Sequence, residues 1–340
     1  MNCCRPLRLA GLFTLGILTC GADAPRVHRL EPTVTTVHRG YFSAEVTPAL
    51  RIASGDIVDI ETLITNTPEG LERMGLPPAE VQQSLRDITA KVPRTLAGHI
   101  LTGPIHVEGA KPGMVLEVRI LSVEPAIPYG YFSCSAEYTL VTANCEAPKD
   151  RIVPLDLKRR VVRPMPGVEI PLRPFFGIIG VSPPPSAGRR SSLPPDNHGG
   201  NMDIKDLVPG AKVFLPVFVE GGNVSIGDGH AAQGDGEVGG TAVETSLRGR
   251  VQIILHRDRT LKWPRIETPT YHATFGADAD LMTATRIAVD EMTTMLMERG
   301  YSRSDANMLT GLAADLKMSE VVDRNMGVYM TIPKSVFVAP

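Results

Sequence analysis

Short stretches in which hydrophobic and polar residues alternate run through most of the chain. A period of two is typical of strands that bury one face. Turn residues separate these stretches, as at 54–56, where Ser-Gly-Asp precedes an alternating segment. The pattern predicts strands at 34–37, 50–53, 57–63, 105–107, 114–123, 212–219 and 246–256. We therefore expect a β-rich body.

Two regions change to the helical period of 3.6. In the first, residues 69–92, a break at 75–78 precedes a helix that carries Val81, Leu85 and Ile88 on one face. This region therefore predicts helical structure interrupted at the proline pair.

The second helical region lies near the C-terminus. Asp278 is placed to cap a helix that runs to Arg299, and Ser302 is placed to begin the next helix. Ser319 predicts a third short helix, and 328–332 a closing strand. The C-terminal part is thus predicted to be α+β.

Composition supports a fold rich in turns. The chain has 32 glycines and 29 prolines among 340 residues, about 18% where about 12% is usual. This excess argues against a coiled coil or a helical solenoid. The prolines crowd residues 146–195, which indicates long ordered loops. We expect residues 25–275 to form one mainly β body, with residues 276–340 packed on it as a helical layer and closing strand.

Residues 1–24 have the pattern of a secretory signal peptide. Arg5 and Arg8 precede an apolar run over Leu9–Cys20, and small residues follow with a plausible cleavage site near Ala22. Twelve apolar residues are too few to span a bilayer, and no later segment is a transmembrane candidate. We expect export to the periplasm or the exterior. The alternatives are a buried first helix and a lipid anchor at Cys20, in a loosely lipobox-like context.

The charge and cysteine content limit which binding partners and which cellular compartment are compatible with the sequence. Lys and Arg total 35 and Asp and Glu total 37, a net charge of −2 without a basic stripe, which excludes a nucleic-acid binder. Outside the leader, Cys134 and Cys145 flank an alternating stretch. In an oxidising compartment this spacing favours a disulfide, and two separate thiols are the alternative.

Two glycine-rich blocks, 194–203 and 227–237, contain most of the polar residues that could bind a metal or take part in catalysis. Each pairs a histidine with nearby carboxylates, and glycine lets the backbone approach a ligand closely. Imidazole with carboxylate suits Zn²⁺, and additional oxygen donors suit Ca²⁺. The alternative is a pair of glycine-rich turns with solvated side chains. The candidate residues are Asp196, His198, Asn201, Asp228, His230, Asp235 and Glu237.

Other reactive side chains are weaker candidates. Ser191 and Ser192 lack the Gly-x-Ser-x-Gly elbow of a nucleophilic serine. Cys134 is a possible thiol nucleophile, although export favours a disulfide. His99 and His272 are second-tier candidates for the functional site. We expect no catalytic role for His28, His38 or His256.

Several blocks in order give the chain a strong resemblance to the acetamidase/formamidase family. The resemblance covers about residues 38–337. Its blocks are Ser54–Asp56, Thr102–Ile105, Val107–Gly113, Phe176–Ser182, Pro194–Asp203, Gly227–Glu237, Ala314–Asp323 and Ile332–Lys334. A set of blocks is far more specific than any single motif.

The resemblance implies hydrolysis of the C–N bond of small amides to a carboxylate and ammonia. It also implies a β-sandwich, jelly-roll-like body, a metal-dependent site with Zn²⁺ and sometimes Ca²⁺, and a homodimer or larger homo-oligomer. The positions that match the family blocks are Asp196, His198, Asn201, Asp228, His230, Gln233, Asp235 and Glu237.

A scheme for the site follows as a hypothesis. The expected ligands are His198, His230 and carboxylates from Asp196, Asp228 or Asp235. Asp235 is also counted among the catalytic residues. Glu237 is expected to act as general base for water and then as general acid for the leaving nitrogen. Asn201 and glycine-rich backbone N–H groups are expected to steady the oxyanion.

Departures from the family pattern concern the substrate more than the reaction. Arg39 follows a histidine where the family commonly has tryptophan, and Lys111–Met114 stands where an acidic pair is usual. Three alternatives stay open: a thiol amidase that uses Cys134, a non-catalytic extracytoplasmic sandwich that binds a sugar or metal, and a family member that acts on cyclic or larger amides.

Overall fold

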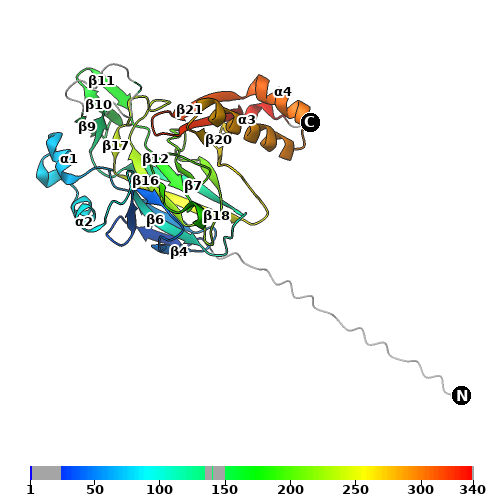
Figure 1. Cartoon of the computed structure of the whole chain (residues 1–340), viewed down its shortest axis with the longest axis horizontal. Helices are drawn as coiled ribbons and strands as arrows, with labels where there is room; N and C mark the ends of the chain where they lie inside the picture. Colours follow the sequence, from blue (N-terminus) through cyan, green and yellow to red (C-terminus); the bar gives the residue numbers. More distant parts are fainter. Residues whose placement is uncertain (2–23, 135–139, 141–149, 339–340) are drawn as a thin grey trace.

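Two large β-sheets and a layer of helices make up the structure, which is a computed structural model (Figure 1). It describes residues 24–134 and 150–338, together with Met1 and Leu140. The sheets have nine and eleven strands, and a two-stranded ribbon joins β3 (Tyr41–Phe42) to β13 (Arg190–Ser191).

The nine-stranded sheet is antiparallel except at one edge, where β1 pairs with β5 in parallel. Its strands in spatial order are β1 (Val27–Leu30), β5 (Ile57–Glu61), β18 (Leu247–His256), β7 (Val115–Pro125), β15 (Lys212–Pro216), β19 (Arg265–Glu267), β20 (Tyr271–Asp278), β22 (Met326–Pro333) and β21 (Asp315–Glu320). The alternating segments 57–63, 114–123 and 246–256 thus form adjacent strands, as their pattern predicts.

The eleven-stranded sheet carries the two polar blocks of the sequence. Its main path is β11 (Val168–Pro171), β10 (Val161–Met165), β9 (Asp150–Asp156), β8 (Tyr129–Ser133), β17 (Glu244–Thr245), β16 (Val224–His230), β12 (Phe175–Gly180) and β14 (Gly199–Asn201). A branch from β16 adds β6 (Ile100–Val107), β2 (Val37–Arg39) and β4 (Leu50–Ile52).

The main hydrophobic core lies between the two sheets. Val118 and Ile253 reach it from the first sheet, and Phe176 and Ile226 from the second, all fully buried. Two sheets that interdigitate apolar side chains in this way form a sandwich. The predicted fold class, mainly β with an α+β C-terminal part, is confirmed.

The predicted helical region 69–92 is confirmed as two short helices around a proline-rich break. They are α1 (Pro68–Arg73) and α2 (Gln83–Lys91), with the 3₁₀ turn η1 (Pro78–Glu80) between them. Leu71, Leu85 and Ile88 pack with Tyr129 and Tyr131 in a second core. These helices therefore hold the segment next to β8 and β6 in place.

The C-terminal layer departs from prediction in two details. Helix α3 (Leu281–Glu298) begins at Asp280, whose side chain accepts from the Thr283 N–H, rather than at Asp278. Helix α4 (Arg303–Ala313) begins at Ser302 as predicted.

The third short helix predicted at Ser319 is wrong, because Asp315–Glu320 forms strand β21 on the edge of β22. Pairing with a neighbouring strand overrides a local capping signal. The remaining 3₁₀ turns are η2 (Pro185–Ala187) and η3 (Lys334–Val336). Within the described residues, we find no helix with both the length and the apolar character needed to cross a bilayer.

Asp56 connects the N-terminal strand to the sandwich through hydrogen bonds, and we expect its substitution to destabilise the fold. Its carboxylate accepts from the Arg26 and Ala53 N–H groups at 3.0 and 3.1 Å and lies 2.8 Å from His28 Nε2. Burial works to raise the pKa of Asp56, but the hydrogen bonds from His28, Arg26 and Ala53 outweigh it and lower the pKa. A carboxyl group whose pKa is lowered in the folded state stabilises the fold at pH values above its unfolded-state pKa, which is about 3.9 for Asp. That stabilisation is lost as the pH falls toward the folded-state pKa.

We therefore expect Asp56→Asn to lower the free energy of unfolding by about 1–3 kcal/mol at neutral pH. The difference from the wild type should shrink toward pH 3. Asp59→Asn is the control, since Asp59 only pairs with Arg250 at the surface and should cost less than about 1 kcal/mol. Urea unfolding at several pH values measures both, and equal costs for the two variants would contradict this role of Asp56.

Candidate active site

Strand β16 places its last polar side chains on one face because glycines occupy the other. In the run Gly-Asp-Gly-His, Asp228 and His230 share a face, while Gly227 and Gly229 face neighbouring backbone. A Cβ on Gly229 would lie 2.5 Å from the Thr245 carbonyl oxygen. Glycine is therefore required here for β16 to pair closely with its neighbours.

His230 lies at the centre of a buried group of acidic side chains. Its Nε2 is 3.0 Å from Asp228 Oδ2, 3.3 Å from Glu244 Oε2 and 4.0 Å from Glu237 Oε1. Its Nδ1 lies 3.7 Å from Asp203 Oδ1. The neighbouring charges therefore converge on one imidazole from several segments.

Gln233 determines which nitrogen of His230 carries a proton. The Gln233 Nε2 donates to the carbonyl oxygens of Asp203 and Ser319, so its Oε1 is the atom 2.8 Å from His230 Nδ1. An amide oxygen only accepts, so Nδ1 donates. The Nε2 lone pair of neutral His230 consequently faces the carboxylates, the orientation that a metal-binding histidine needs.

A second part of the cluster lies between Asp203 and Asp323. The Asn201 Nδ2 donates to Asp323 Oδ2 at 2.7 Å. Neither carboxylate oxygen of Asp203 has a hydrogen-bond partner in the described structure, although Asp203 is fully buried. A buried carboxylate without partners is unfavourable by itself.

Burial and mutual repulsion change the ionisation of this cluster. Burial, followed by the charge of Glu237, raises the pKa of Asp203 well above its ordinary range. Burial likewise raises the pKa of Glu237 well above its ordinary range, and that of Asp323 to about 6. Burial lowers the pKa of His230, but Glu244 and Asp228 outweigh it and raise that pKa. The site is thus short of positive charge.

The residues present fit a bound metal ion. Three groups have ligand atoms within 4.8 Å of one another: Asp203 with Asp228 and His230, His230 with Glu237 and Glu244, and Asp203 with Glu237 and Asp323. The unpartnered Asp203 oxygens and His230 Nε2 are donors that a cation would satisfy. Oxygen with one imidazole nitrogen is a donor set known for divalent cations.

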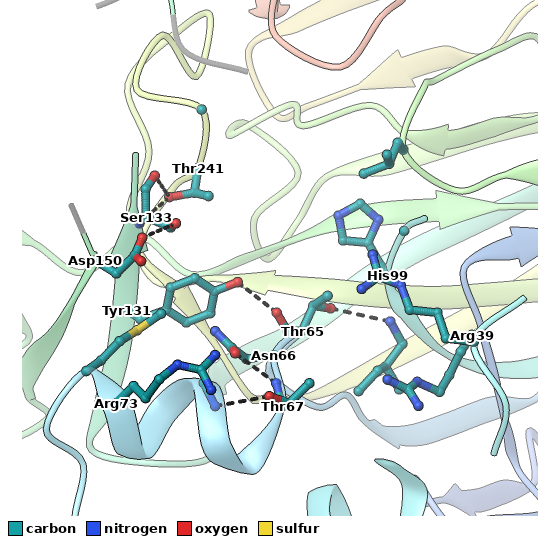
Figure 2. A pocket seen from close by; sticks show the side chains of 17 residues that line it. Arg39, Thr65, Asn66, Thr67, Arg73, His99, Tyr131, Ser133, Asp150 and Thr241 are labelled. Carbon is teal, nitrogen blue, oxygen red and sulfur yellow. Dashed lines mark hydrogen bonds between the residues drawn. The ribbon is translucent and has the colours of Figure 1, made fainter. Parts of the chain in front are cut away.

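An inner cavity of about 190 Å³ gives access to this cluster. Asn201, Asp228, Glu237, Glu244 and Asp323 line its polar side. It adjoins an outer cavity of about 680 Å³, shown in Figure 2. Both cavities are lined by Thr65, Arg94, His99, Tyr131, Leu193, Gly240 and Thr241.

His99 lies where the two cavities meet and faces the cluster. Its Nδ1 lies 3.1 Å from the Ser192 carbonyl oxygen, and its Nε2 lies 3.7 Å from Asp228 Oδ1. Because a carbonyl only accepts, Nδ1 donates and Nε2 is the nitrogen that faces Asp228. The Ser192 Oγ accepts from the His99 N–H at 2.9 Å, so this buried serine holds the histidine in place.

The structure brings only part of the sequence-predicted site together. Asp228, His230 and Glu237 meet in the cluster, and Asn201 joins it through Asp323. Asp235, by contrast, forms an ion pair with Lys205 at 3.0 Å, and its side chain is 45% exposed.

The first polar block contributes differently from what was expected. His198 packs edge-on against Phe42, with ring centroids 5.0 Å apart, and burial lowers its pKa to about 4. Asp196 forms a β-bridge with Gly199. Neither belongs to a potential metal group in the described chain, so we revise the expected ligand set.

Three residues of the cluster were missed by sequence reasoning. Asp203 and Asp323 end two of the family blocks, which was the available signal, whereas Glu244 stands outside any acidic pattern. His99, a second-tier candidate from the sequence, lies beside the cluster. Cys134 is disulfide-bonded, and its predicted partner Cys145 lies outside the described residues. A sulfur in a disulfide is not a thiolate nucleophile, which removes the basis for a thiol amidase.

Comparisons with known proteins agree on one family. A family model described as "Acetamidase/Formamidase family" matches residues 41–192 and 185–339. An acetamidase structure from Yersinia enterocolitica is 30% identical with a TM-score of 0.79, covering 95% of this chain and 96% of that one.

Two curated relatives match over shorter stretches. The formamidase of Methylophilus methylotrophus is 38% identical over 109 residues, and the acetamidase of Mycolicibacterium smegmatis is 29% identical over 199 residues. These matches cover 29% and 41% of this chain, and 25% and 49% of the relatives' own lengths.

Proposed function

The chain belongs to the acetamidase/formamidase family, and from this premise we propose that it is a metal-dependent hydrolase of small linear amides. The reaction adds water across the C–N bond and yields a carboxylate and ammonia. The observation that carries the proposal is the buried cluster of carboxylates around His230, which lines a cavity of about 190 Å³. Since a water molecule occupies about 30 Å³, this space suits an amide of a few heavy atoms.

The proposed ligands are those whose donor atoms converge around His230 Nε2 and the unpartnered oxygens of Asp203. They are His230, Asp203, Asp228 and Glu244, with Asp323 close by. A bound Zn²⁺ or Ca²⁺ ion supplies a Lewis acid that polarises the amide carbonyl and makes a nearby water more acidic. We favour Zn²⁺, because His230 offers an imidazole nitrogen directed at the carboxylates.

Glu237 is the proposed proton carrier. It lines the inner cavity, and no protein hydrogen bond to its carboxylate is found among the described residues. Its oxygens are therefore available to take a proton from the attacking water and to deliver it to the departing nitrogen. His99 Nε2 is the second group in the cavity that can exchange a proton, and the Asn201 amide positions Asp323.

The proposal extends to where the protein works and how it assembles. The leader pattern of residues 1–24 supports export to the periplasm or the exterior, and the disulfide-bonded Cys134 agrees with an oxidising compartment. Following the family resemblance, we propose that the mature chain forms a homodimer or larger homo-oligomer.

Ammonia release from formamide and acetamide by the purified protein tests the reaction. We expect turnover with bound metal, a loss of at least about 100-fold after treatment with a strong chelator, and recovery when Zn²⁺ or Ca²⁺ is returned. Metal content measured alongside activity identifies the ion. Full activity in the chelated, metal-free protein would refute metal dependence, and the absence of ammonia from every small linear amide would refute the function.

A further inference from the structure

The outer cavity is far larger than formamide or acetamide requires. Its volume of about 680 Å³ compares with about 190 Å³ for the inner cavity beside the cluster, and cavities of 300–1,000 Å³ typically bind larger ligands. Its walls include three arginines, namely Arg39, Arg73 and Arg94, and one carboxylate, Asp150. This wall therefore carries an excess of positive charge.

These arginines have no acidic partner among the described residues. Arg39 at the end of β2 is only 8% exposed, and its one side-chain hydrogen bond goes to the Val92 carbonyl oxygen at 2.9 Å. Arg94 reaches only the Leu96 carbonyl, at 3.3 Å. Arg73, at the end of α1, forms no ion pair within the described chain. Asp150 is bonded to Ser133 instead.

The arginines lie around the same cavity, so their positive charges repel one another. In the view of Figure 2, Arg39 and Arg73 stand on opposite sides of the cavity, with His99 above Arg39. Burial, and then the positive charge of Arg94, lower the pKa of Arg39. By contrast, the buried Arg265 has Glu298 as a partner and the partly buried Arg86 has Glu72. Arg39 is thus a buried cation without an acidic partner, which is unfavourable, and an anion placed beside it would relieve this. Arg73 and Arg94 are exposed and would add further positive charge around the anion.

We infer that the outer cavity binds a carboxylate carried by the substrate, so that the preferred substrate is a linear amide with a carboxylate at its other end. This inference rests on the proposed function for the amide end and on the arginines for the acid end. Guanidinium groups match the planar carboxylate through paired N–H donors. The amide would enter the inner cavity past His99, which lines both spaces.

A matched pair of substrates isolates the charge. Succinamate carries the carboxylate, and in its neutral isostere 4-oxopentanamide a methyl group replaces one carboxylate oxygen. We expect kcat/KM to be at least about tenfold higher for succinamate, the effect of one charge-assisted hydrogen bond or more. The preference should fall in about 1 M NaCl, where the screening length is about 3 Å. Equal kcat/KM values for the two amides would overturn the inference.

Variants assign the preference to the arginines. Arg39→Gln and Arg73→Gln should each reduce the ratio of the two kcat/KM values by about tenfold. If Arg39→Gln fails to fold, Arg39→Lys keeps the charge but not the paired donors, and should still reduce the ratio. Arg286→Gln is the control, because Arg286 is exposed on α3 in the C-terminal layer, which lies away from α1 (Figure 1). An unchanged ratio in both Arg39 and Arg73 variants would overturn the assignment.

A binding experiment separates this inference from the proposed function. Succinate has the carboxylate but no amide, and calorimetry should show that it binds the wild type and binds the Arg39 and Arg73 variants at least about tenfold more weakly. If succinate binds in this way and no amide is hydrolysed, the anion site stands and the proposed function fails. If acetamide is hydrolysed while succinate does not bind and succinamate is not preferred, the function stands and the inference fails.

Discussion

Glu237→Gln is expected to lower kcat/KM for acetamide by about 10²–10⁴-fold while the metal stays bound. The amide of glutamine keeps the shape of the side chain but cannot accept a proton from water. Asp203, Asp228, His230 and Glu244 retain their donor atoms in this variant. The loss should therefore appear in catalysis rather than in metal content.

Steady-state ammonia release and metal analysis on the same preparation measure this effect. Glu220→Gln is the control, since Glu220 is exposed and lies outside both cavities. Its activity and metal content should match the wild type. Wild-type activity in Glu237→Gln would exclude Glu237 as the proton carrier, and loss of the metal in that variant would make it a ligand instead.

His230→Gln is expected to lose the metal and to destabilise the fold by about 3–5 kcal/mol, the effect of leaving buried carboxylates without a cation. The imidazole lies 3.0 Å from Asp228 and 3.3 Å from Glu244. Without it, buried carboxylates from several segments face one another with no nearby cation. Metal content and urea unfolding of the purified variant report the two losses separately.

The control for that experiment is His198→Gln, because sequence reasoning placed His198 and His230 in the same ligand set. His198 is equally buried but packs on Phe42 and belongs to none of the potential metal groups in the described structure. We expect it to lose packing energy and to keep the metal. The opposite result, metal lost with His198 and kept with His230, would restore the original ligand set and refute the one proposed from the structure.

How far the sequence predicts the site depends on how its residues are distributed along the chain. Asp228, His230 and Glu237 stand in one block, so proximity in sequence was enough to group them. Asp323 and Glu244 join the cluster only because a distant loop and a neighbouring strand fold close to β16. Periodicity carries no information about such contacts.

The same limit explains the errors in the fold. The proline break within 69–92 and the alternating strands are local signals, and the structure confirms them. Strand β21 depends on the edge that β22 offers, and the ion pair of Asp235 depends on Lys205 from another segment. Where a residue's structure depends on a partner from a distant part of the chain, a single sequence does not contain enough information to predict it.

The contact between Asn201 and Asp323 spans 122 positions of the chain and has a consequence for biosynthesis. Asp323 lies beyond helix α4, so a chain still emerging from the ribosome, or any fragment limited to the β body, lacks part of the cluster. The cluster around the proposed metal site would therefore be complete only when almost the whole polypeptide has been made and folded, and a site that is not preformed binds its metal as folding completes. A chain exported in the unfolded state would take its metal from the compartment in which it arrives, so the ion available there, rather than the cytoplasmic supply, would determine which metal the enzyme carries.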